Sequence, residues 1–165
     1  MEIVDRRLIA AAGRGQMALM EECIALGARE VDAAMVAAAD GGHEDAMCLC
    51  RAWGARDVNH TMVAAAANGH EALMRRCHGW GARDVDAAMA MAAHNGHSAL
   101  VRGCYEWGAR DVDRAMALAA REGHELVMSL CVELGAHDID HPHLGEAMAA
   151  AGSSEPPIRP TAGSS

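Results

Sequence analysis

The chain has 165 residues, a formal net charge of −9 and fourteen basic residues, all of them arginine. An acidic chain without a basic block repels phosphate, which argues against nucleic acids and anionic membranes as ligands. No stretch approaches the roughly 18 apolar residues of a membrane span, and the first residues lack the pattern of a secretory signal. We therefore expect an intracellular, cytoplasmic protein. The lack of lysine fits either a GC-rich genome or evasion of lysine modification.

A 27-residue period organises the sequence. The glycine of a recurring Gly-Ala tetrapeptide occurs at Gly27, Gly54, Gly81, Gly108 and Gly135. Five full units span residues 4–138, and a degenerate sixth follows over 139–151, so we predict a repeat domain over residues 1–151. Residues 152–165 are rich in Gly, Ser and Pro, a composition that is typical of a disordered tail.

Each unit predicts two short helices. In the second unit, Asp32 is placed as the N-cap of a helix over residues 33–39, and residues 40–42 break that helix. A second helix is predicted over 43–53, where Ala46, Met47, Cys50 and Trp53 form one apolar stripe. Gly54 then stands at the C′ position, which favours a left-handed residue. Helices this short are unstable alone, so stacking of units predicts an all-α solenoid of helix-turn-helix repeats.

This unit resembles the ankyrin repeat. Ala38-Ala39 precedes the turn, Gly42-His43 opens the second helix, and Gly54-Ala55 leads to Asp57-Val58-Asn59. The family consensus has 33 residues, and these units have 27; the missing residues form the hairpin tip in the family, so reduced or absent β-hairpins are implied. Units shortened in this way are similar to ankyrin-like repeats of multigene families in large DNA viruses. The resemblance covers about four fifths of the chain.

Several recurring side chains have both a structural and a chemical interpretation. One cysteine per unit stands on the second helix, and since packed helices lie about 8–10 Å apart, this cysteine ladder favours core packing over disulfides. Cys48 lies outside the ladder and is expected to be more exposed. The histidines at the turns are too far apart to share a metal ion, so we expect each imidazole to bond to backbone instead. The methionines that recur on both helices are interpreted as core. The segment from His137 to His143 is either a metal site or a solvated terminal turn.

No nucleophile with a neighbouring base, no phosphate-binding loop and no cofactor motif can be assembled, so we expect neither an enzyme nor a cofactor. Positions that vary between units are free to recognise a partner. The resemblance to ankyrin repeats implies that first helices line a concave face, which would carry the varying positions. These candidate partner-binding residues, the recognition strip, include Arg6, Arg14, His60, Asn68, His94, Asn95, Arg114 and Arg121. A partly exposed series of Trp53, Trp80 and Trp107 is a second candidate contact.

The leading hypothesis is therefore a protein-binding adaptor, viral in origin, with an unidentified protein partner. The alternative is a structural role as a self-associating stack. Arg6 and Arg7 give the first unit a polar end, and Pro142 with the polar tail makes the last unit unfit to extend the stack. These features favour a monomer.

Overall fold

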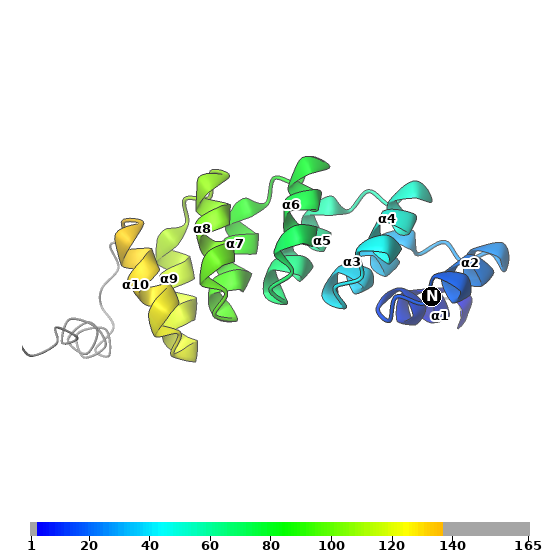
Figure 1. Ribbon diagram of the computed structural model, residues 1–165, viewed down its shortest axis with the longest axis horizontal. Helices are drawn as coiled ribbons and strands as arrows, with labels where there is room; N and C mark the ends of the chain where they lie inside the picture. The colour runs from blue at the N-terminus through cyan, green and yellow to red at the C-terminus, as the bar shows by residue number, and fades with distance from the viewer. Residues whose placement is uncertain (1–2, 137–165) are drawn as a thin grey trace, which may run out of the picture.

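The computed structural model describes residues 3–136, which form ten α-helices and contain no β-strand. The degenerate sixth unit, the tail and the segment from His137 to His143 lie outside these residues. Figure 1 shows the five units side by side, so the predicted all-α solenoid is confirmed. The helices are α1 (Ile3–Ala12), α2 (Met17–Ala25), α3 (Val31–Asp40), α4 (Glu44–Ala52), α5 (Val58–Ala67), α6 (Glu71–Gly79), α7 (Val85–His94), α8 (Ser98–Glu106), α9 (Val112–Glu122) and α10 (Glu125–Glu133). None of them is long and apolar enough to cross a bilayer.

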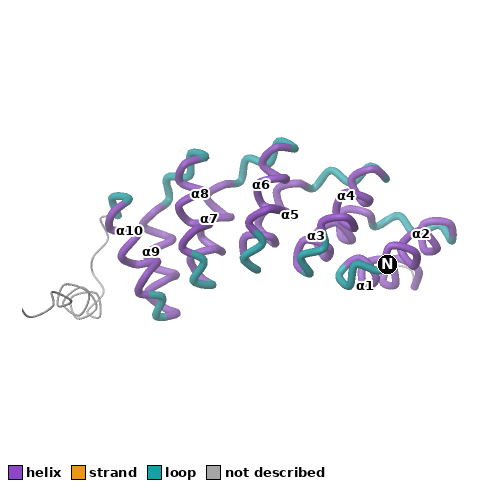
Figure 2. Tube along the Cα trace, in the orientation of Figure 1, coloured by secondary structure: helices purple, strands orange, loops and turns teal. Residues whose placement is uncertain are grey.

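The stack is held mainly by its first helices. Each first helix packs against the second helix of its own unit and against the first helix of the next unit, from α1 to α9. The second helices of neighbouring units make far fewer contacts with one another. The units form an arc, and the tight turns within the units lie on its inner edge, as the lower loops of Figure 2 show. The first helices therefore form a closely packed row, and the second helices fan apart.

Alanine, methionine and cysteine provide most of the buried core, together with a few leucines and valines. The cysteine ladder is fully buried, and so are the methionines at the repeating core positions of both helices. All six cysteines are free thiols, and Cys48 is only half-buried, in agreement with its predicted exposure. Adjacent first helices approach closely because they meet through alanines such as Ala38 and Ala65, which are completely buried.

The predicted N-cap is wrong by two residues. Asp32 lies inside the first turn of α3, and the residue at the N-cap is Glu30. Where a side-chain cap forms, the residue before the valine provides it: Asp57 accepts from the backbone N–H of His60, and Asp111 accepts from that of Arg114. Asp32 has a different role, because its carboxylate accepts hydrogen bonds from the loop that ends its own unit and leads to the next.

A carboxylate or amide in each first helix accepts two backbone N–H groups from the loop that follows the second helix. Asp86 Oδ1 accepts from Arg110 at 2.7 Å and from Asp111 at 2.8 Å, and Asn59 Oδ1 accepts from Arg83 at 2.8 Å and from Asp84 at 3.3 Å. Asp5 and Asp32 make the same pair of contacts. We call this set the loop latch. It explains why an acceptor recurs at this position in every unit, although it does not cap the helix.

The turn histidines bond to backbone, as predicted, and the structure shows that these bonds link neighbouring units. The Nε2 atoms of His70, His97 and His124 lie 2.9–3.2 Å from a backbone carbonyl of the preceding unit. Each ring lies on the turn glycine of that preceding unit; a Cβ at Gly42 would come within 2.7 Å of the His70 ring. Gly42 also has a φ of 76°, so both its conformation and its close contact require glycine.

Candidate recognition surfaces

The predicted recognition strip lies along the exposed side of the first helices and along the turns that follow them. Arg6, His60 and Arg114 stand one turn into α1, α5 and α9, while His94 and Arg121 stand near the C-terminal ends of α7 and α9. Arg14, Asn68 and Asn95 belong to the turns. His94 is half-buried and the other seven residues are exposed. These residues occupy three positions of the unit, and small residues such as Ala33 and Ala87 stand between some of them, so the polar groups are distributed along the first-helix side and the inner edge of the arc.

Several residues of the strip contact the neighbouring unit. The amide of Asn68 donates to Asp40 Oδ1 at 3.0 Å, and it also donates to the Ala64 carbonyl at the same distance. His94 Nδ1 lies 3.5 Å from a carboxylate oxygen of Glu122, although this nitrogen is buried and makes no hydrogen bond within the described residues. These contacts hold the polar groups in fixed orientations, a property that lowers the entropic cost of binding at any surface that has it.

Sequence reasoning missed the apolar middle of this surface. Met91 and Leu118 occupy the same position of the unit as Ala37 and Ala64, and all four are half-buried on the first helices. Apolar residues in a helix suggested core packing, so these two side chains were not separated from the buried Met89 and Met116. The usable signal was the kind of variation: this position changes from Ala to Met and Leu between units, while the position of Met89 and Met116 is a large apolar residue in every unit, with Leu8 in the first. Within each first helix, this apolar position lies between the strip position near the start of the helix and the strip positions at its end.

The tryptophans lie on a different surface from the strip. Trp53, Trp80 and Trp107 are C-cap residues of the second helices, half-buried as predicted. Two of them contact a side chain of the preceding unit. The Arg51 guanidinium lies 5.8 Å from the Trp80 ring centroid, and the His78 imidazole stacks on Trp107 with 4.4 Å between the ring centroids and 15° between the planes. The first-helix strip and the tryptophan series are therefore two separate candidate surfaces.

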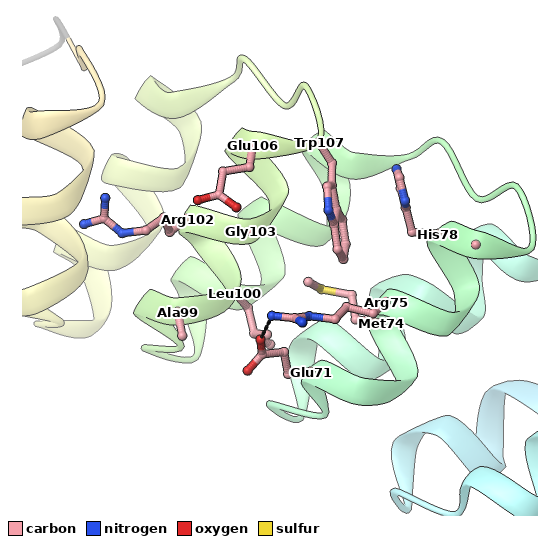
Figure 3. Close-up of a pocket in the computed structure, with 11 residues that line it drawn as sticks. Glu71, Met74, Arg75, His78, Ala99, Leu100, Arg102, Gly103, Glu106 and Trp107 are labelled. Carbon is pink, nitrogen blue, oxygen red and sulfur yellow. Dashed lines mark hydrogen bonds and ion pairs between the residues drawn. The ribbon is translucent and has the colours of Figure 1, made fainter.

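A cleft of about 680 Å³ opens between α6 and α8, next to Trp107. In Figure 3 the indole of Trp107 stands between the imidazole of His78 and the space above Gly103. Met74 and Leu100 form the apolar floor, and both are almost completely buried. Glu71 and Arg75, which are paired, lie at the far end. The cleft exists because second helices of neighbouring units fan apart.

The buried thiols are not suited to nucleophilic chemistry. Burial raises the pKa of Cys50, Cys77 and Cys104 from the ordinary value of 9.0 to about 12, and the pKa of Cys131 to about 11. A thiol with such a pKa is protonated at neutral pH and does not act as a nucleophile or as a metal ligand. Within residues 3–136, no group of three or more His, Cys, Asp or Glu side chains is placed to hold a metal ion.

No protein-family model matches the chain, and a search of curated proteins finds no similar sequence.

Proposed function

We propose that this chain is a protein-binding adaptor of the ankyrin-like type, and that the recognition strip on its first helices is the surface that contacts the partner. One observation carries the proposal. Along the first helices and the turns that follow them, the positions that vary from copy to copy lie on the accessible side, while most constant positions of the unit fill the core or link neighbouring units. A solenoid needs the constant positions to fold, so the varying face is available for recognition.

The chemistry of the strip fits a protein ligand. Half-buried Met91 and Leu118 provide adaptable apolar area, and charged or amide groups surround them, an arrangement typical of an interface with an apolar centre and a polar rim. Arginines contribute at both ends of the array, and arginine is enriched in protein interfaces. A cytoplasmic location and a viral origin belong to the same proposal, and the viral origin is implied by the sequence resemblance.

Charge reversal of Arg114 and Arg121 to Glu, in one variant, tests the strip. The immobilised wild-type chain should capture a partner from a host-cell lysate. The double variant should capture at least tenfold less of that partner, as measured by quantitative mass spectrometry. The matched control reverses Arg56 and Arg83, which are exposed in the loops after second helices and away from the strip. Equal loss in both variants would indicate a general charge effect and would refute the strip as the contact surface.

The alternative proposal is a self-associating structural role. It predicts assemblies larger than one chain, whereas the adaptor proposal predicts a monomer. Light scattering over a range of protein concentrations separates the two, because a mass that rises with concentration would favour self-association.

A further inference from the structure

The cleft between α6 and α8 owes its shape to two helical glycines. A Cβ added at Gly79 would meet no atom within 4 Å, and one at Gly103 would meet only the Met74 methyl carbon, at 3.9 Å. Packing therefore does not require glycine at either position, and both have ordinary helical backbones. Glycine within a helix destabilises it relative to alanine, so these two positions leave open a space that side chains could have filled.

The preceding groove shows what fills the equivalent space. The unit position of Gly103 is occupied by Arg76 in α6, and the Arg76 guanidinium forms an ion pair with Glu44 of α4. Glu71 holds the position of Glu44 one unit later. Between α6 and α8 the carboxylate is therefore retained as Glu71, but Gly103 replaces the arginine that would extend toward it from α8.

An aromatic face and a carboxylate flank this space. His78 covers one face of Trp107, and the other side of the indole borders the cleft (Figure 3). Glu106 lines the same space, and within the described residues it makes no hydrogen bond or ion pair, whereas the two lining arginines do: Arg75 pairs with Glu71, and Arg102 with Glu133 at 3.4 Å. The side chains that remain available to a ligand are an indole and an anion, which together favour a cation.

We propose that the α6–α8 cleft binds one arginine side chain presented by a partner polypeptide. The apolar stem would lie on Met74 and Leu100, and the guanidinium would stack on Trp107 within reach of Glu106. A planar guanidinium both stacks on an indole and donates to carboxylates, which an ammonium does less well. The chain already uses this pairing internally, since Arg51 lies over Trp80 and Arg110 lies 5.0 Å from the Tyr105 ring centroid. This site is separate from the recognition strip, so either proposal can fail alone.

Trp107 fluorescence tests the proposal in a full-length variant with Trp53→Phe and Trp80→Phe. Titration with N-acetylarginine amide at constant ionic strength should give a saturable change with a dissociation constant on the order of 1 mM, as befits so small a ligand. N-acetylcitrulline amide has the same shape without the charge and should bind at least tenfold more weakly. A five-residue peptide with a central arginine and flanking alanines should bind more tightly than the amide.

Four single substitutions in the same background locate the site. Gly103→Leu introduces the leucine found at the equivalent positions Leu49 and Leu130, and Gly103→Arg places a guanidinium of the chain itself in the cleft. Both substitutions should abolish the fluorescence change on titration without lowering the melting temperature. Glu106→Gln should weaken binding about tenfold, the size of effect typical of losing one charged hydrogen bond. Ala18→Leu on exposed α2 is the matched control for added bulk and should bind as the parent does.

The following results would overturn the proposal. Equal binding of citrulline and arginine, or unchanged binding by the Gly103 variants, would place the effect outside the cleft. Equal binding of N-acetyllysine amide would show that charge alone is recognised. A peptide no tighter than the amide would exclude a polypeptide ligand. Tighter binding after Arg159→Ala would identify the chain's own C-terminal segment as the occupant.

Discussion

At the scale of single residues, burial decides which cysteine thiols are accessible to reagents in solution. The five thiols of the cysteine ladder are inaccessible, whereas Cys48 is half-buried on α4. The sequence distinguished Cys48 only because it lies outside the 27-residue period. The equivalent positions in the following units, Arg75, Arg102 and Ser129, are exposed, so Cys48 lies on the solvent side of its helix.

Thiol labelling of the native protein should therefore modify one cysteine per chain. We expect a small disulfide reagent to react with Cys48 and to reach the other five only after denaturation. Mass spectrometry of the labelled peptides checks this, with Cys48→Ala as the control that should remain unlabelled in the native state. Rapid native labelling of a ladder cysteine would show that the units open far more readily than their burial indicates.

The raised thiol pKa values also predict lower stability at alkaline pH. Folded Cys50, Cys77 and Cys104 keep their protons up to about pH 12, whereas the unfolded thiols lose theirs near pH 9, so the folded state binds more protons in between. The free energy of unfolding should fall as pH rises above 9, by at most about 1.4 kcal/mol per thiol per pH unit. Urea denaturation at several pH values, under reducing conditions, measures the slope, and Cys104→Ala should reduce it. A flat profile would contradict the effect of burial.

At the scale of helices and loops, the loop latch fixes how one unit sits on the next. Its acceptors lie in the first turn of each first helix, where a carboxylate also interacts favourably with the helix dipole. The acceptor reaches the N–H groups of the loop 24 and 25 residues later. A one-residue insertion in that interval would move the loop out of reach, which accounts for the constant 27-residue spacing.

Replacing Asp86 with Ala removes two hydrogen bonds between α7 and the loop that leads from the fourth unit to the fifth. We expect a loss of about 1–2 kcal/mol in the free energy of unfolding, since the bonds are partly exposed. Asp86→Asn is the matched control, because Asn59 makes the same two contacts in its own unit. It should lose clearly less than Asp86→Ala in urea denaturation. Equal losses would mean that charge, and not the acceptor geometry, stabilises the latch.

At the scale of the whole molecule, stability is shared between neighbours, because each unit buries its core against the next. Met62 is completely buried in α5, the first helix of the central unit, which packs against both α3 and α7. A substitution that destabilises this position should therefore also destabilise the units on both sides of it.

Met62→Ala should lower the free energy of unfolding by about 2–5 kcal/mol through the cavity that it creates. Hydrogen exchange followed by mass spectrometry should show faster exchange in α3 and α7 as well as in α5. Leu126→Ala, at a side chain that is 80% exposed, should change stability by less than about 0.5 kcal/mol. Faster exchange confined to α5 and α6 would indicate units that fold independently.

The sequence by itself determined the repeat, the two helices per unit and most of the core, because these depend on local propensity and on a period that needs no distant information. The all-α fold, the buried cysteines and methionines and the histidine contacts were all predicted in this way. The tertiary structure alone decided what the helix-start acceptors do, since Asp32 looks like a cap until the loop that follows α4 is placed beside it. It also decided that the strip and the tryptophans form separate surfaces, and that Gly79 and Gly103, in different units, open one cleft. Such features depend on how far neighbouring helices spread, and that distance is set by packing between units.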